Sequence, residues 1–344
     1  MKRGRLLLVF AFLIALSSPL YAEQEAAEIL KAVVKLRSVV PEDARTARIL
    51  GTEREGSGVV IDSDGHVLTI GYLIVEAETI EVVPHDGKPI SATFVGYDHR
   101  TGFGLLRTEK PVSVVPMKLG RSSEVKQGDP VLVADHGGSG SVQQARVVSR
   151  GEFAGYWEYL LEDAFYVSPP HPNFGGAALI DPNGELLGIG SIFTQLSISG
   201  IGSIPCNMFV PIDLLKPILA DLISTGRSRQ PSRPWLGVYA EEAHGRVFVV
   251  RVTSGGPAER AGIQPGDVIL TVKGMEIKGL SDFYRKVWTL GAAGIDVPLS
   301  ILQGIRIRDI TVHSADRSQF LQLKPKKPPQ KAPGGGVVRS GFMS

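Results

Sequence analysis

The residues of this 344-residue chain that could perform nucleophilic catalysis are scattered along the sequence. Such catalysis needs a serine or cysteine nucleophile, a histidine that accepts its proton, and an acidic residue that orients the histidine. The chain has seven histidines and one cysteine. Ser57 and Ser139 lie in glycine-flanked turns, and His136 lies in the loop 135–138. Turn formation alone accounts for both serines, so the sequence offers no complete nucleophilic motif.

Cysteine and metal chemistry are limited in the same way. Cys206 stands in an apolar stretch beside Pro205 and Met208, which favours a buried thiol over a reactive one. No two histidines have the HxxH or HExxH spacing typical of zinc sites, and a single cysteine cannot form a disulfide within the chain. We therefore expect no metal site and no cofactor.

The composition predicts a globular protein rich in β structure. The chain is 43% hydrophobic and 21% charged, with 40 glycines and 23 prolines. So many turn residues favour strands over a helical bundle. The length predicts about two domains, at roughly 100–200 residues each. The formal net charge is only +2, and nothing in it indicates nucleic-acid binding.

The first half of the chain has the pattern of a sandwich or barrel. Short strand-like runs follow one another from residue 33 to residue 192, and turn pairs such as Asp64-Gly65 separate them. An apolar segment with helical spacing, 212–223, closes this region. We expect residues 23–223 to form one domain, followed by a basic, proline-containing linker over 224–234.

A second, smaller unit is expected over residues 235–320. It contains short strand-like runs, a short helix over 258–261 and a longer helix over 281–290. The tail 321–344 is rich in proline, glycine and lysine. Because such a composition buries little apolar surface, we expect the tail to be disordered and basic.

The N-terminus is typical of a secretory signal peptide, residues 1–22. Three basic residues precede the apolar run 6–16, and small residues before position 23 allow cleavage after Ala22. A bilayer span needs about 20 apolar residues, so the length of this run favours a cleaved signal peptide over a membrane anchor. We expect a periplasmic or secreted protein. The alternative is a protein anchored in the membrane by this N-terminal segment.

Five stretches of the first unit occur in a specific order. They read GSGVVIDSDGHVLT (56–69), GYDHRT (96–101), LGRSS (119–123), LIDPNGELLGI (179–189) and FVPID (209–213). Together they resemble the HtrA/Deg family of secreted trypsin-like serine proteases with a C-terminal PDZ domain. The resemblance implies a mainly β fold, in which a trypsin-like double β-barrel is followed by a PDZ domain.

The same resemblance locates the catalytic triad of such an enzyme, and none of its three positions holds the required side chain. Tyr72 stands where the family has histidine, and a phenol with a pKa of about 10 is a poor base at neutral pH. Gly102 replaces the aspartate and Phe174 replaces the serine. Pro172 stands where a backbone N–H would stabilise the oxyanion, and proline has none. Any one of these losses is enough to abolish useful proteolysis.

A displaced active site is the alternative. His171 and Ser168 shortly precede Phe174, and His136 lies near the expected cleft. A rebuilt triad would need its groups placed within about 0.5 Å of a productive geometry. We expect no proteolytic activity, and an active HtrA-like serine endopeptidase in envelope protein quality control stays open as the rival hypothesis.

Two motifs of the second unit resemble the PDZ domain of this family. They are RPWLGV (233–238), similar to the carboxylate-binding loop, and PAERAGIQPGDVI (257–269). A PDZ domain adds a peptide as a strand and binds its C-terminal carboxylate through backbone N–H groups. The peptide-binding residues implied by the resemblance are Leu236, Gly237, Val238, Val287 and Leu290.

These inferences predict an exported HtrA-like pseudoprotease. Its expected partners are polypeptide C-termini or unfolded envelope proteins, and it could regulate a partner protease. A homo-oligomer, or a hetero-oligomer with active paralogues, is a further possibility. No nucleic-acid partner is expected.

Overall fold

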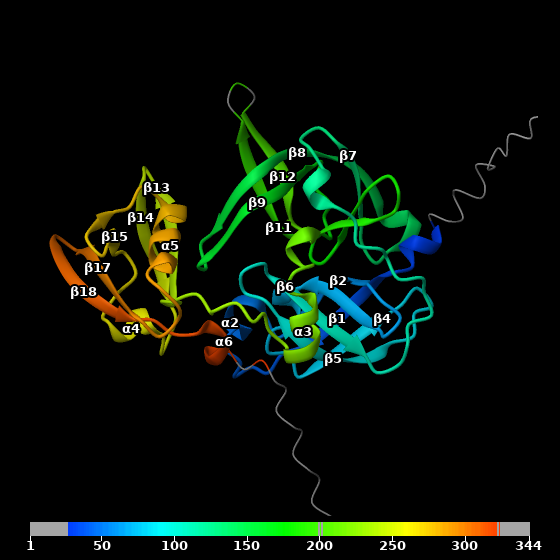
Figure 1. Ribbon diagram of the computed structural model, residues 1–344, viewed down its shortest axis with the longest axis horizontal. Coiled ribbons are helices and arrows are strands. Elements are labelled where there is room, and N and C mark those ends of the chain that lie inside the picture. Colours follow the sequence, from blue (N-terminus) through cyan, green and yellow to red (C-terminus); the bar gives the residue numbers. More distant parts are fainter. Residues whose placement is uncertain (1–26, 199, 201, 322, 324–344) are drawn as a thin grey trace, which may run out of the picture.

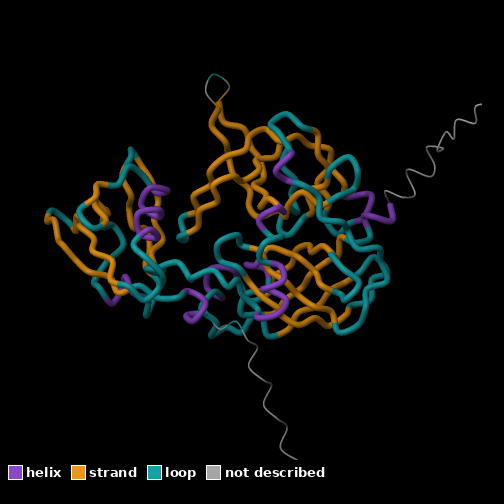
Figure 2. Tube along the Cα trace, viewed as in Figure 1, coloured by secondary structure: helices purple, strands orange, loops and turns teal. Residues whose placement is uncertain are grey.

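The structure, a computed structural model, describes residues 27–198, 200, 202–321 and 323. The expected signal peptide 1–22 and nearly all of the expected tail 321–344 lie outside these residues. Figure 1 shows two β-barrels side by side and a smaller β unit beyond them. Strands dominate all three, and the helices are short (Figure 2). The predicted mainly β fold with two barrels is confirmed.

The first barrel closes from six antiparallel strands in the order β1-β2-β3-β6-β5-β4. Apolar side chains such as Val59, Leu68 and Leu105 fill it and are fully buried. Its strands are β1 (Val33–Val39), β2 (Glu53–Val60), β3 (His66–Ile70), β4 (Thr79–Val83), β5 (Ile90–Tyr97) and β6 (Phe103–Thr108). The short helices α2 (Ala47–Leu50) and η1 (Gly71–Leu73) lie in its loops.

The second barrel closes in the order β10-β11-β12-β9-β8-β7. Phe165, Leu179 and Phe209 are fully buried in it. Its strands are β7 (Pro130–Ala134), β8 (Val142–Gly155), β9 (Tyr159–Ser168), β10 (Ala178–Ile180), β11 (Leu186–Ile198) and β12 (Gly202–Pro211). The turns η2 (Ser122–Glu124) and η3 (Gly138–Ser141) precede β7 and β8.

The expected helix over 212–223 is interrupted. The structure has a short turn η4 (Ile212–Leu214) and then helix α3 (Leu219–Thr225). Pro217 stands between them, and proline cannot donate the hydrogen bond that a continuous helix needs at that position. The apolar spacing of the segment is therefore used by two short elements instead of one helix.

The third unit is a β-sheet in the order β13-β14-β15-β17-β18, flanked by helices. Its strands are β13 (Val238–Ala243), β14 (Arg246–Val252), β15 (Val268–Val272), β16 (Met275–Glu276), β17 (Asp296–Gln303) and β18 (Arg306–His313). Helices α4 (Pro257–Arg260), α5 (Leu280–Thr289) and α6 (Arg317–Phe320) complete it. Helix α5 buries Phe283, Tyr284 and Val287 against the sheet.

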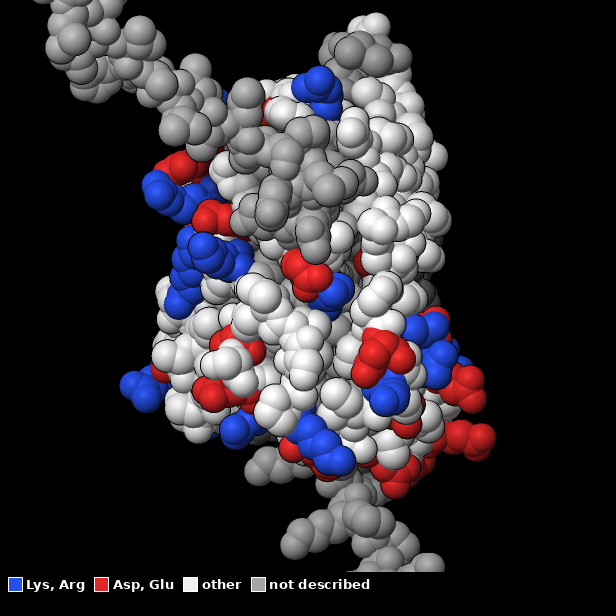
Figure 3. All heavy atoms as spheres, turned by 90° about the vertical axis from the view of Figure 1, so that its right-hand side faces the viewer, with Lys and Arg blue, Asp and Glu red and all other residues white. Residues whose placement is uncertain are grey.

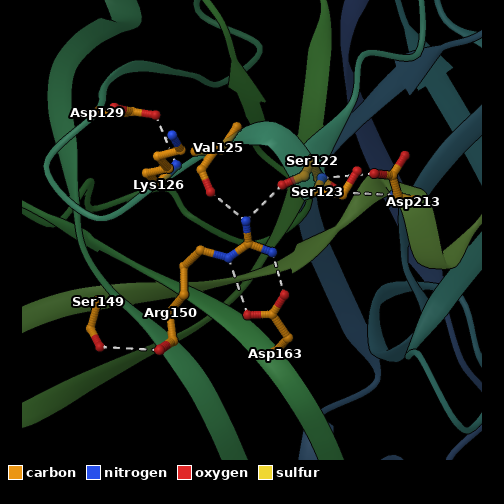
Figure 4. Close-up of polar contacts among 9 residues, drawn as sticks. All are labelled: Ser122, Ser123, Val125, Lys126, Asp129, Ser149, Arg150, Asp163 and Asp213. Atoms are coloured by element: carbon orange, nitrogen blue, oxygen red, sulfur yellow. Dashed lines mark hydrogen bonds and ion pairs between the residues drawn. The ribbon is translucent and has the colours of Figure 1, made fainter.

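The β8–β9 hairpin extends from the second barrel toward α5 (Figure 1). Figure 4 shows the polar contacts of Arg150 of β8, which lies midway along the paired part of this hairpin. The Arg150 guanidinium donates to the carbonyl of Ser122 at 2.9 Å and to that of Val125, and its Nε donates to Asp163 of β9 at 3.1 Å. These hydrogen bonds tie both strands of the hairpin to the 122–125 turn, so the middle of the hairpin is held on the barrel.

The surface of the barrels carries both signs of charge. On the face drawn in Figure 3, basic and acidic side chains are interspersed over the lower part, and the described surface at the upper right is largely uncharged. Within the described residues, no helix has the length and apolar character needed to cross a membrane.

Candidate functional site

Tyr72 lies in the turn η1, directly after strand β3. Its hydroxyl donates a hydrogen bond of 2.8 Å to the carbonyl oxygen of Ser191 in the second barrel. Burial raises the pKa of the Tyr72 phenol well above its ordinary value. The ring therefore links the two barrels, and its hydroxyl keeps its proton at neutral pH.

Arg54 fixes the backbone of this turn. Its Nη1 donates to the carbonyls of Tyr72 at 2.8 Å and Val75 at 2.9 Å, and its Nη2 donates to Thr46 at 2.8 Å. Arg54 is only 6% exposed, and burial lowers its pKa to about 10, against the opposing effect of Glu76. The buried guanidinium therefore holds together the segments of the first barrel that carry Thr46, Tyr72 and Val75.

Gly102 precedes strand β6 and has a left-handed backbone, with φ of +82°. Its carbonyl accepts a 2.7 Å hydrogen bond from Gly71, so it lies against the turn that bears Tyr72. A Cβ atom at this position would lie 3.2 Å from the hydroxyl of Tyr159. That hydroxyl donates to the Thr101 carbonyl at 2.6 Å, so the space beside Gly102 is filled by another side chain.

Phe174 lies in the loop between β9 and β10 and is half-buried. The loop is held by hydrogen bonds from Ser57 N–H to Gly175 at 2.9 Å and from Gly176 N–H to Gly190 at 2.9 Å. Gly176 has φ of +76°, and a Cβ there would meet the Ser57 carbonyl. Pro172 is exposed at the start of this loop and offers no N–H.

These positions meet at a cavity of about 450 Å³. Tyr72, Gly102 and Phe174 all line it, and Arg317 is the one charged side chain among its described lining residues. Its walls are mainly aromatic: Tyr72, Tyr97, Tyr156, Trp157, Tyr159, Phe174, Phe193 and Tyr239. Such a surface binds apolar groups and contains no pair of groups suited to acid–base catalysis.

The structure brings one serine and one histidine together outside this cavity. Ser57 Oγ lies 3.2 Å from His136 Nδ1, and it also accepts the His136 backbone N–H at 3.2 Å. Ser57 is 0% exposed, so a substrate cannot reach its hydroxyl. The carboxylate of Asp135 accepts from Gly137 N–H and from the Asn173 amide, each at 2.7 Å. Neither contact orients the His136 ring, as the acid of a triad does.

The other candidate nucleophile and the acidic turn add no reactive centre. Cys206 is fully buried, as expected, and burial raises the pKa of its thiol. Asp62, Asp64 and His66 have possible ligand atoms within 4.8 Å of one another. Asp62 already accepts from the backbone N–H groups of Asp64 and His66, at 3.0 and 3.1 Å, so its carboxylate stabilises the β2–β3 turn.

In the third unit, the backbone N–H groups of Leu236, Gly237 and Val238 converge on one acceptor. The acceptor is the side-chain carboxylate of Glu158, at 2.9, 2.7 and 3.0 Å respectively. Gly237 has a φ of +80°, and this left-handed backbone turns the loop so that its successive N–H groups point toward the Glu158 carboxylate. Burial raises the pKa of Glu158 to about 7, although these three hydrogen bonds act in the opposite direction.

The two helix residues predicted to line the peptide pocket lie in the core of this unit. Val287 is 1% exposed, and Leu290 is partly buried against the same cluster. Trp235 is 7% exposed and packs on Phe320 of α6, with ring centroids 4.7 Å apart. The groups that already bind a carboxylate are therefore the three loop amides and not the apolar helix residues.

Sequence reasoning missed Glu158 entirely. It lies at the tip of the β8–β9 hairpin, 78 residues before Leu236 along the chain. The available signal was the sequence Tyr156-Trp157-Glu158-Tyr159, because three aromatic rings at a hairpin turn need a surface to cover them.

Comparisons with known proteins match both parts of the chain. Residues 56–189 match the model of the trypsin-like peptidase domain, and residues 234–313 match the model of the PDZ domain. A probable periplasmic serine endoprotease DegP-like from Pseudomonas putida (strain W619) is 31% identical over 290 residues, covering 79% of this chain and 58% of that protein. A probable periplasmic serine protease do/HhoA-like from Haemophilus influenzae is 30% identical over 294 residues, covering 79% and 61%.

This chain thus spans about three-fifths of the length of these curated relatives. Among solved structures, the HtrA-type protease AlgW with tripeptide matches with a TM-score of 0.50 and 24% identity, covering 85% of this chain and 96% of that one. The serine endoprotease from Yersinia pestis matches with a TM-score of 0.50 and 23% identity, covering 85% and 97%. At this level of identity the solved structures bear on the fold alone, and they agree with two barrels followed by a PDZ domain.

Proposed function

The chain belongs to the HtrA family, and from this premise we propose that it is a pseudoprotease of that family, which binds polypeptides without cleaving them. The relatives are named as periplasmic serine proteases, which supports an assignment of this chain to the same compartment. The proposal assigns the barrels a structural and binding role and assigns ligand capture to the PDZ domain.

The observation that carries the proposal is Phe174 in the loop that faces the cavity. A family enzyme needs a hydroxyl at this position, and a phenyl ring has no nucleophilic atom. The Tyr72 hydroxyl is bonded to Ser191 and has a raised pKa, so it is no proton acceptor at neutral pH. Gly102 has no side chain that could orient a base, and Pro172 donates no N–H to an oxyanion.

The proposed ligands are polypeptide C-termini and unfolded envelope proteins. The three loop amides of Leu236, Gly237 and Val238 have the geometry to bind one carboxylate, because all three already bind that of Glu158. In this role the protein would hold exported chains or regulate a partner protease, alone or assembled with active paralogues. Val287 and Leu290 remain the proposed apolar pocket for the last side chain of the ligand.

A working endopeptidase with a displaced active site is the second candidate, because Ser57 and His136 lie 3.2 Å apart. Two observations disfavour it. Ser57 has no solvent access, and the neighbouring Asp135 is bonded to Gly137 and Asn173. A nucleophile must reach the carbonyl carbon that it attacks, so the buried Ser57–His136 contact supports a structural role better than a catalytic one.

Labelling of the full chain by a serine-directed fluorophosphonate probe, together with casein turnover, tests the proposal. We expect neither labelling nor turnover. Label found on Ser57 by mass spectrometry, with casein cleavage that Ser57→Ala removes and Ser139→Ala retains, would establish the second candidate instead. Ser139 is the matched control because it lies in an exposed glycine-rich turn.

A further inference from the structure

The peptide groove of the PDZ domain, between β13 and α5, is filled by the chain itself. The tip of the β8–β9 hairpin, residues 155–160, lies in it, and Figure 1 shows the hairpin reaching from the second barrel to α5. The Glu158 carboxylate accepts the N–H groups of Leu236, Gly237 and Val238. The C-terminal carboxylate of a peptide would need these same donors, so the two ligands exclude each other.

Both walls of the groove bind the backbone of the tip. In β13, Ala240 N–H donates to the Tyr156 carbonyl at 2.8 Å. On α5, the Tyr284 hydroxyl donates to the Gly155 carbonyl at 2.8 Å and accepts the N–H of Glu158 at 3.2 Å. Main-chain hydrogen bonds to a groove strand are the means by which an added peptide strand gains affinity.

The hairpin also contributes an apolar anchor. Leu160 belongs to strand β9 of the barrel, yet its side chain is 4% exposed and is buried in the hydrophobic cluster of the PDZ domain. Ala154 of β8 packs against the same cluster. Since a carboxylate and a neighbouring apolar side chain are what a peptide C-terminus offers, the tip supplies both parts of such a ligand from one turn.

Charge holds the stem of the hairpin in place. Arg285 of α5 pairs with Glu152 of β8 and with Glu162 of β9, one on each side of the tip. The Arg285 Nε donates to Glu162 at 3.2 Å as well. These partly exposed ion pairs add an attraction that salt can screen.

We propose that residues 154–162 are the resident ligand of this groove, and that a polypeptide C-terminus binds only by displacing them. The inference rests on the proposed peptide-binding function and adds the competitor that every peptide must displace. The displacing peptide needs a free C-terminal carboxylate and an apolar last side chain, the two parts that Glu158 and Leu160 supply in the hairpin.

Amide hydrogen exchange of the full chain tests this occupancy without any peptide. The proteins are the wild type, Glu158→Ala and the control Glu78→Ala, which alters an exposed glutamate before β4. We expect the amides of residues 236–238 to be protected in the wild type and the control, and to exchange at least about tenfold faster in Glu158→Ala. Unchanged exchange in the barrel strands verifies that the variant is folded. Equal exchange of 236–238 in all three proteins overturns the inference.

Peptide binding by the same three proteins provides the second readout. The probes are fluorescein-labelled decapeptides that end in Val, Leu, Ile or Phe, each with a free or an amidated C-terminus. We expect Glu158→Ala to bind the free-carboxylate peptides at least about tenfold more tightly than the wild type and Glu78→Ala do. The reason is that an empty groove, which alone can bind a peptide, becomes the main population once the hairpin no longer fills it. Equal affinity in all three overturns the inference. Lost protection without binding of any peptide supports the resident ligand and refutes the proposed peptide-binding function.

Discussion

The hydroxyl of Tyr159 lies 3.2 Å from the position that a Cβ atom of Gly102 would take. Tyr159 belongs to the second barrel and Gly102 to the first, and the contact fills the site at which the family resemblance places an acidic side chain. The backbone at Gly102 is also left-handed, with φ of +82°. Both the space and the conformation therefore oppose a side chain here.

Gly102→Asp is expected to destabilise the protein by about 2–4 kcal/mol, because the new side chain adds backbone strain and displaces Tyr159. Gly87→Asp is the matched control. Gly87 has φ of +75°, yet nothing lies within 4 Å of its Cβ position, so it isolates the strain. Urea denaturation measures both variants. Equal losses of unfolding free energy would show that the Tyr159 contact is unimportant.

An acidic side chain at position 102 is strained and crowded by Tyr159. We therefore expect that restoring the three triad residues does not restore catalysis. We predict that the triple variant Tyr72→His, Gly102→Asp, Phe174→Ser neither reacts with a fluorophosphonate nor cleaves casein, and that it unfolds at lower urea than Tyr72→His, Phe174→Ser. A second reason is that Pro172 still provides no N–H to the oxyanion, and the loss of one such donor costs about 10²–10³ in rate. Turnover by the triple variant above the level of the double variant would contradict this.

Arg54→Ala is expected to cost about 3–5 kcal/mol of unfolding free energy, since it removes a buried cation beside Glu76 and frees the turn carbonyls of Tyr72 and Val75. Arg121→Ala, at an exposed arginine, should stay within about 0.5 kcal/mol of the wild type. Urea denaturation followed by far-UV circular dichroism distinguishes the two. A loss at position 54 as small as that at 121 would refute the structural role.

Peptide affinity of the full chain is expected to rise as the pH is raised from 5 to 8. The pKa of Glu158 is raised from 4.5 to about 7 in the docked hairpin, where burial outweighs the loop amides and the nearby Arg317, and Tyr284 also faces it. A raised carboxyl pKa stabilises docking below about pH 4.5, and this contribution is lost as the pH rises through 7. Fluorescence anisotropy with a free-carboxylate peptide measures the trend.

Glu158→Gln is the control for this pH dependence, because its amide retains the shape and the acceptor oxygen but does not titrate. Its peptide affinity should be nearly constant over the same range. If the two proteins show the same pH profile, the titrating group is elsewhere, and Glu158 does not set the strength of docking.

Reversal of the charge at Arg285 is expected to open the groove. Arg285→Glu replaces two attractions, to Glu152 and Glu162, with two repulsions, so we expect peptide affinity at least several-fold tighter than in the wild type. Arg306→Glu alters an exposed arginine on β18 of the same domain and should have no effect. High salt should tighten binding by the wild type alone. Weaker binding by Arg285→Glu would contradict the clamp.

The sequence predicted the local features of the fold and failed where distant parts meet. The motif stretches and turn pairs indicated two barrels and a PDZ domain, because each depends on residues close in the chain. The helix expected over 212–223 is split at Pro217, a signal that was present but outweighed by apolar spacing. Glu158 could not be assigned, since its partners lie 78 to 80 residues away and share no pattern with it.

The candidate site divides in the same way. The resemblance placed Tyr72, Gly102 and Phe174 from short motifs, and the structure finds all three around one cavity. Two contacts each join a residue of the first barrel to a residue of the second: Ser57 with His136, and Gly102 with Tyr159. These distances depend on how the two closed barrels pack together, so they could not be predicted from the composition or from the spacing of residues along the chain.

Neighbouring residues at the hairpin tip have separate surroundings. Glu158 is bound to the PDZ loop, while Trp157 and Tyr159 on either side of it line the aromatic cavity and stack with centroids 5.5 Å apart. Any event that withdraws the carboxylate must therefore also disturb the indole. Trp157 is therefore a built-in fluorophore for PDZ occupancy. If a bound peptide end changes the affinity of the aromatic cavity for an apolar molecule, thermodynamic reciprocity requires that molecule to change the affinity for the peptide end by the same factor.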